Sequence, residues 1–459
     1  MALSEADADP RSSGGASLSM HHSTMHHRTF VRAHIWLALA AVLSAVGGWL
    51  YVQRVLIAHQ IGYATVHGTP RGNLSDLYPR WIGAQELLLH GRDPYSAEVT
   101  REIQAGYYGR PLDPSRPEDP KDQQAFAYPA YVVFYLAPAI HLGFGIVQRA
   151  FLWILIGVTL ASIPLWLRVL SWPVAPAVQA AMMALLLGSM PVLQGLKLQQ
   201  LTLLVAAMCA LAMALLVAGR PIAAGILLAL ATIKPQLVLP LLLWLGMWSL
   251  GDLKRRYRWA VSFLIVIAVL SVAAECWLPH WIGRFWQAAV EYRQYTRATP
   301  ILEVILPHPW GRLLEALFAG ATALVCWKLR KYPENTGAFQ SSTCLVMALT
   351  VLAVPTFSLY NQVLLLPAIL LLVRDRRTIW ERSLVSRGIL IVVAAVLAWP
   401  WLSSTALGGL SLVLPQETID SAWAIPAWTV AEIPVGVAAL MLVHYYQKTF
   451  TAPAGRGTS

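Results

Sequence analysis

One carboxylate, Asp76, stands where it could act as a general base. It follows the first long apolar run, 35–56, by about twenty residues and opens the stretch 76–95. Trp81 and Leu87 in this stretch predict a helix that lies on the membrane surface. A carboxylate beside apolar surface gains the basicity that a general base needs. The alternative is that Asp76 only caps the start of the helix, a common role for aspartate.

A single lysine, Lys234, lies in the middle of the apolar run 221–250 and is followed by Pro235. A charged side chain at membrane depth is costly and by default indicates function. The proline interrupts a helix and frees backbone groups that can line a cavity. A cation at such a break suits an anionic phosphate. If the run is instead a hairpin of two short helices, Lys234 would extend to the membrane interface.

A second group of cations lies in the polar stretch 279–310, where arginines alternate with tryptophans and tyrosines. Two of them, Arg293 and Arg297, are candidates for phosphate recognition, because a guanidinium binds phosphate in a two-pronged fashion. The alternative is contact with solvent or with lipid head groups.

Polar side chains also stand at the ends of apolar runs. Gln200 precedes the run 201–218, and Asn361 and Gln362 lie near the start of another. Helix capping explains either cluster alone, but the two together suggest a shared polar cavity. Tyr128 lies at the entrance to a further run, where tyrosine is typical of the aromatic belt at a membrane interface.

The elements that carry these residues are predicted to be transmembrane helices. Of the 459 residues, 57% are hydrophobic and only 12% are charged, against about 25% charged in soluble proteins. Runs of about 20 apolar residues cross a bilayer as helices, and the alternating pattern of barrel strands is absent. The sequence predicts an all-α, polytopic protein with about twelve spans, near 35–56, 129–146, 149–168, 174–190, 201–218, 221–250, 258–278, 311–329, 341–356, 359–373, 384–404 and 426–446.

Charge fixes the expected topology. The net charge of +11 comes largely from basic clusters at 254–258, 328–331 and 374–377, which indicate cytoplasmic loops rather than binding of nucleic acid. The predicted organisation is a disordered cytoplasmic tail, a membrane domain with two extracytoplasmic loops, and a cytoplasmic C-terminal tail, at 1–30, 31–448 (loops 57–127 and 279–310) and 449–459. The four cysteines lack the spacing of a zinc site or a disulfide framework.

Several short motifs, in order, resemble glycosyltransferase family 87. They are Asp76-Leu-Tyr, Gly91-x-Asp-Pro-Tyr95, Phe126-x-Tyr-Pro129, Gln200-x-Thr202, Ala224-Gly225, Ile233-Lys-Pro-Gln236 and Pro355-x-x-Ser-x-Tyr-Asn-Gln362. The family comprises mannosyltransferases of the GT-C fold that depend on polyprenol-phosphate-mannose. The resemblance runs from about residue 35 to residue 375.

The resemblance implies an inverting transfer of a sugar, with mannose expected, from a polyprenyl-phosphate donor to an acceptor hydroxyl at the outer face of the cell membrane. Asp76 maps onto the family's base, and Lys234 with the arginines would stabilise the leaving phosphate. Gln200, Asn361, Gln362 and Tyr128 would contribute to substrate binding. No nucleotide, metal or other cofactor is then required. The partners are the donor lipid, a glycan or glycolipid acceptor and membrane lipids.

The chain departs from the family pattern at two places. Gln199 stands where a glycine commonly precedes the family's glutamine, and Asn361-Gln362 stands where many members carry a histidine. His308 is a possible substitute for that histidine at the donor phosphate. The competing interpretation is a multi-pass transporter or lipid flippase, which would predict an internal repeat and paired intramembrane charges. The sequence shows no such repeat.

Overall fold

The fold is helical throughout the part of the chain that the structure describes. The computed structural model describes residues 35–68, 75–296, 299–354 and 358–450, with side chains to residue 444. Within these ranges it contains helices and no strand, which confirms the all-α prediction. The tail 1–30 and residues 451–459 lie outside the described ranges.

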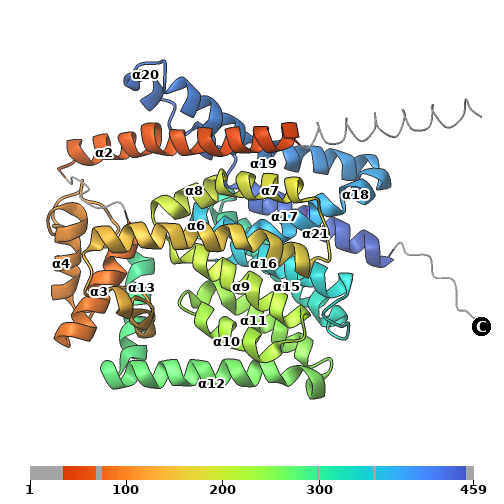
Figure 1. Ribbon diagram of the computed structural model, residues 1–459, viewed down its shortest axis with the longest axis horizontal. Helices are drawn as coiled ribbons and strands as arrows, with labels where there is room; N and C mark the ends of the chain where they lie inside the picture. Colours follow the sequence, from red (N-terminus) through yellow and green to blue (C-terminus); the bar gives the residue numbers. More distant parts are fainter. Residues whose placement is uncertain (1–34, 69–74, 297–298, 355–357, 451–459) are drawn as a thin grey trace, which may run out of the picture.

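The longest helices extend along the length of the molecule (Figure 1). One extends over Ile35–Val66 and includes a π-helical turn, η1 (Val52–Leu56), and α2 (Ile57–Val66). It therefore continues beyond the end at residue 56 that the sequence predicts. The others are α6 (Phe144–Val169), α12 (Leu253–Trp277) and α19 (Leu384–Leu410).

Five helices of the described chain are long and apolar enough to cross a membrane, or up to six if the bent pair α7 and α8 forms one span. The chain is thus a membrane protein, while the count of about twelve spans stays a prediction. Several of the expected spans are short helices in the structure. The run 359–373, for example, is divided into η4 and α17. The remaining elements are α3 (Leu77–His90), α4 (Ala97–Tyr108), η2 (Ala130–Val132), α5 (Val133–Leu136), η3 (Ala137–Ala139), α7 (Pro176–Leu187), α8 (Met190–Lys197), α9 (Leu201–Val217), α10 (Pro221–Ala231), α11 (Pro235–Ser249), α13 (Trp281–Thr296), α14 (Ile301–Ile305), α15 (Trp310–Leu329), α16 (Gly337–Ala353), η4 (Leu359–Leu365), α17 (Leu366–Arg374), α18 (Arg376–Arg382), α20 (Gln416–Asp420), η5 (Ile425–Ala427) and α21 (Glu432–Phe450).

Small residues let the central helices approach closely. At Gly225 of α10, an added Cβ would lie 2.1 Å from both the carbonyl oxygen of Trp259 and the Oγ of Ser262 in α12. Backbone cannot move aside as a flexible side chain can, so only glycine fits this crossing. The Ala224-Gly225 motif therefore has a packing role in this fold.

We expect the substitution Gly225→Ala to destabilise the protein, because overpacking a tight site typically costs about 1–3 kcal/mol. The measurement is the thermal unfolding midpoint of the purified protein in detergent. Gly157→Ala in α6 is the matched control, since nothing lies within 4 Å of an added Cβ there. Equal midpoints for the two variants would show that α10 and α12 are not in contact as described.

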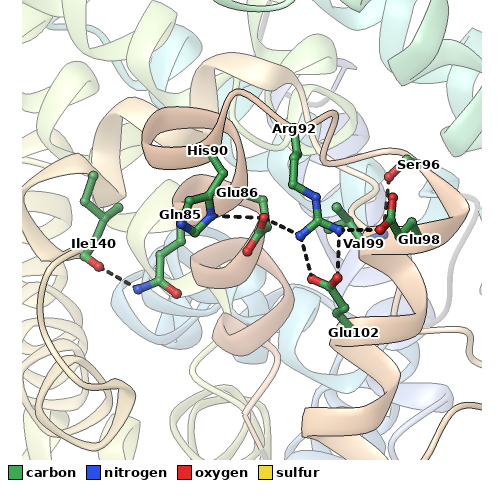
Figure 2. A network of polar contacts seen from close by, with 9 residues as sticks. All are labelled: Gln85, Glu86, His90, Arg92, Ser96, Glu98, Val99, Glu102 and Ile140. Atoms are coloured by element: carbon green, nitrogen blue, oxygen red, sulfur yellow. Dashed lines mark hydrogen bonds and ion pairs between the residues drawn. The ribbon is translucent and has the colours of Figure 1, made fainter.

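The first polar stretch is a folded unit. Arg92 lies between α3 and α4 (Figure 2), where its guanidinium contacts Glu86 at 2.8 Å and Glu102 at 2.7 Å. The predicted helix is present as α3, and Gly91 ends it with a left-handed φ of 65°. Its apolar face does not lie on the membrane surface, because Trp81 and Leu87 are buried in the protein core.

The second polar stretch docks on the first. Arg284 of α13 forms an ion pair with Asp93, which follows α3, and the ring of Trp281 contacts Tyr131 at 5.5 Å. Figure 1 shows α3, α4 and α13 gathered at the left end of the molecule, whereas α18 lies at the right end. The helices of both polar stretches therefore cover the same end of the helical bundle.

Candidate active site

A polar cavity of about 430 Å³ lies between the two polar stretches and the ends of the central helices. It is the place where side chains from widely separated parts of the sequence meet. The residues that line it are Asp76, Arg80, Asp122, Gln124, Ala125, Ala127, Tyr128, Pro129, Gln200, Ile233, Lys234, Pro235, Gln236, Phe285, Trp286, Ala289, Val290, Tyr292, Arg293, Val354, Ser358, Tyr360 and Asn361.

Asp76 occupies the N-cap position of α3, yet its carboxylate is directed elsewhere. Within α3, which the structure describes in full, the side chain makes no capping hydrogen bond, and Ser75 Oγ accepts the hydrogen bond from the backbone N–H of Leu77. The Asp76 carboxylate instead accepts hydrogen bonds from the amide Nε2 of Gln200 and from the hydroxyl of Tyr107, the latter at 3.4 Å. The backbone N–H of Asp76 donates to the carbonyl of Leu198 at 2.8 Å, which fixes the carboxylate at the cavity.

Lys234 reaches the same cavity from the break between α10 and α11. Both interpretations of the run 221–250 require a break, and the structure shows it between Ala231 and Pro235. Lys234 is 6% exposed, and its ammonium group donates to Gln200 Oε1 at 2.7 Å and to Thr202 Oγ1 at 2.8 Å. The side chain therefore points into the protein and not toward an interface.

One amide, that of Gln200, joins the proposed base to the lysine. Its Nε2 donates to Asp76 and its Oε1 accepts from Lys234. An amide offers its donor and its acceptor on different atoms, so this orientation matches a carboxylate on one side and an ammonium on the other. Thr202 extends the network by donating to Asn361 Oδ1 at 3.2 Å.

The preceding residue, Gln199, is one of the two places at which the chain departs from the pattern that the resemblance implies. Its φ is 52°, in the left-handed region that favours glycine and costs other residues energy. The Gln199 side chain compensates by accepting from Ser75 and donating to the carbonyl of Gln148. The strained turn places Gln200 between Asp76 and Lys234.

Positive charge exceeds negative charge around the cavity. Arg80, Lys234 and Arg293 face the carboxylates of Asp76 and Asp122. The Arg80 guanidinium lies 4.2 Å from the centre of the Tyr128 ring, while Lys234 Nζ lies 5.0 Å from that of Tyr360. Aromatic faces stabilise cations without neutralising them, so the cavity keeps an attraction for an anion.

Two of the predicted site residues that the structure describes are not part of this cavity. Gln362 is turned away, because its Nε2 donates to the carbonyl of Val430 at 2.7 Å and it lines a separate, apolar cavity. His308 is exposed and does not line the polar cavity. Arg297 lies outside the described residues. The other six, Asp76, Tyr128, Gln200, Lys234, Arg293 and Asn361, all line the cavity.

Sequence reasoning missed two charged members of the site, Arg80 and Asp122. Arg80 lies one helical turn after Asp76, and side chains four residues apart share a helix face, so this spacing was a usable signal. Asp122 lies in an irregular segment before α5, where no periodicity points to it.

The arrangement combines a hydrogen-bonded carboxylate with buried and partly buried cations around a space that holds a small ligand. A carboxylate can accept a proton from a hydroxyl group. Cations fixed in place before the reaction stabilise negative charge that develops on a leaving group. These are the two requirements for displacing a phosphate from a carbon atom by an alcohol.

Comparison with known proteins gives one match. The sequence model of glycosyltransferase family 87 matches residues 126–355, half of the chain. The matched region includes Tyr128, Gln200, Lys234 and Arg293, but it begins after Asp76. No curated protein and no solved structure matches the chain.

Proposed function

The chain belongs to glycosyltransferase family 87 and is a membrane glycosyltransferase, and from this premise we propose that it transfers mannose from a polyprenyl-phosphate donor to an acceptor hydroxyl. The cavity around Asp76 and Lys234 supports the proposal. Its excess of cations suits a lipid phosphate, and its volume of about 430 Å³ suits a sugar with its phosphate.

In the proposed reaction Asp76 removes the proton from the acceptor hydroxyl. The oxygen of the acceptor forms a new bond to the anomeric carbon, from the face opposite the phosphate. The bond between the anomeric carbon and the phosphate oxygen breaks, and the lipid phosphate leaves with the electron pair. The configuration at the anomeric carbon is therefore inverted. Lys234, with Arg80 and Arg293, stabilises the charge on the departing phosphate.

Two features support an active site at the extracytoplasmic face of the cell membrane. Arg256 donates to the carbonyl of Arg330 at 2.7 Å, which brings the basic clusters 254–258 and 328–331 together. The third cluster, 374–377, adjoins α18, at the end of the molecule opposite α3, α4 and α13 (Figure 1). Basic loops favour the cytoplasmic side, so the cavity would open on the other side.

The observation that carries the proposal is that the Gln200 amide contacts both Asp76 and Lys234. The test is an assay of the purified full-length protein, in detergent or in vesicles, with radiolabelled polyprenyl-phosphate-mannose and a membrane extract as the source of acceptor. We expect radiolabel to appear in a product other than the donor. If only nucleotide sugars support transfer, the lipid-phosphate donor is wrong. Movement of intact donor between leaflets without transfer would favour a flippase.

We expect Arg293→Ala to raise the KM for the donor by roughly tenfold with a smaller change in kcat. Arg293 is exposed at the edge of the cavity. It would therefore bind the phosphate equally strongly in the ground state and in the transition state, so its loss affects KM more than kcat. Steady-state kinetics against donor concentration provide the measurement. The control is Arg312→Ala, because Arg312 pairs with Glu303 at 3.1 Å and does not line the cavity. An unchanged KM would remove Arg293 from the donor site.

A further inference from the structure

We propose that a second polar cavity, of about 760 Å³, binds the saccharide part of the acceptor, and that this saccharide carries no net negative charge. The cavity lies between α2, the segment 117–122 and Trp423. The inference rests on the proposed function, because it names the class of acceptor that reaches Asp76.

Stacked rings form part of the wall. The ring of Trp423 stacks on His59 with centroids 4.5 Å apart and planes 17° apart, and Tyr63 stacks on His67 at 4.0 Å. The His59 ring also contacts Asp420 at 2.9 Å, which fastens α20 to α2; both lie near the left end of the molecule in Figure 1. Rings held in this way present rigid, partly apolar faces beside polar edges.

A sugar ring matches such a wall. Its C–H face is apolar and packs on an aromatic ring, while its hydroxyl groups donate to and accept from neighbouring polar side chains. Gln60 and Glu118 provide such polar groups next to the rings. Gln60 already accepts a hydrogen bond from Lys197, but a lipid tail would cover the exposed carboxylate of Glu118 without offering it a hydrogen bond, at a cost in free energy.

The charge of the second cavity is opposite to that of the first. Glu118, Asp119 and Asp122 line it together with one cation, Lys121. Asp119 forms an ion pair with Arg110, which lowers the pKa of Asp119 to about 2 and balances its charge. The excess of negative charge therefore rests on Glu118 and Asp122 against Lys121. An acidic wall repels phosphate, which excludes an anionic lipid head group as the favoured ligand.

The two cavities adjoin at Asp122, which lines both. Two consecutive tyrosines of α4 connect them: the hydroxyl of Tyr107 donates to Asp76, and that of Tyr108 donates to the carbonyl of Asp122 at 2.7 Å. The rings of the two tyrosines lie 4.9 Å apart. A saccharide in the second cavity would therefore lie beside the first cavity, which holds the carboxylate of Asp76 and, in the proposed reaction, the donor phosphate.

The test measures binding apart from turnover. The full-length protein in detergent is applied to an array of neutral oligosaccharides of hexoses and pentoses. Phosphorylated oligosaccharides and anionic phospholipid vesicles test the alternative, which is that the cavity binds an anionic ligand. We compare the wild type with Trp423→Ala, and use Trp428→Ala as the matched control. Trp428 belongs to the same segment but stacks on Trp399 and lines neither cavity.

We expect the wild type to bind at least one neutral oligosaccharide, and Trp423→Ala to bind it roughly tenfold more weakly, as follows from loss of a contact worth about 1.4 kcal/mol. Trp428→Ala should bind as the wild type does. Glu118→Gln supplies a second test that leaves the aromatic packing intact, and it should weaken binding while the unfolding midpoint stays unchanged.

Three results would overturn the inference: equal binding by Trp423→Ala and the wild type, binding of phosphorylated probes alone, or no neutral ligand at all. If the wild type still transfers sugar from the lipid donor in any of these cases, only the acceptor site is wrong. If oligosaccharides bind but no lipid donor supports transfer, the proposed reaction is wrong instead.

Discussion

Asp76→Asn is expected to reduce kcat by about 10²–10⁴-fold, the usual contribution of a positioned general base, while the protein folds and still binds the donor lipid. Asparagine keeps the size of the side chain and can still contact Gln200, but it cannot take the proton of the acceptor hydroxyl. The measurement is the rate of sugar transfer at saturating donor, together with binding of the labelled donor to the same preparation.

The matched control is Asp113→Asn. Asp113 belongs to the same polar stretch and accepts hydrogen bonds from Ser115, but it lines neither polar cavity. Its variant should transfer sugar at the rate of the wild type. An Asp76→Asn protein with full turnover would show that another group, such as Asp122, acts as the base.

Lys234→Met is expected to lower kcat/KM for the donor by about 10²–10³-fold, because it removes a fixed cation from the proposed leaving group. Methionine has a similar length and fills the same space without the charge. Replacing a buried charge by an apolar side chain of similar volume need not destabilise a protein, so the variant should remain folded. Transfer kinetics and the thermal unfolding midpoint, measured on one preparation, separate the two effects.

Lys254→Met serves as the control for loss of a lysine, since Lys254 is exposed in the basic cluster at the start of α12. It should leave the transfer rate unchanged. A Lys234→Met protein that is folded and fully active would mean that the buried lysine only supports packing, and that Arg80 and Arg293 suffice for the phosphate.

Much of the site could be predicted from the sequence because its residues are out of place in an apolar chain. Lys234 lies among apolar residues, Asp76 stands alone before a helix, and Gln200 opens a buried helix. Each costs free energy where it lies unless a partner compensates. The structure supplies those partners by bringing the three side chains into contact.

The remainder depends on tertiary geometry that periodicity does not encode. Asp122 reaches the cavity from an irregular segment. The direction in which Gln362 points is set by the tight 3-10 helix η4, which presents Asn361 to one cavity and Gln362 to another. The same holds for the helices. Apolar runs predict that the chain is helical, but they do not show where each helix breaks. The sequence predicts the run 359–373 as one span, yet the structure divides it into η4 and α17.

The most direct test of the account is a cryo-EM map of the Asp76→Asn protein with bound polyprenyl-phosphate-mannose. We expect density for the phosphate beside Lys234 and Arg80, with the sugar between the phosphate and residue 76. Phosphate density beside the basic cluster 374–377, at the opposite end of the molecule, would contradict the proposed site and the orientation derived from it.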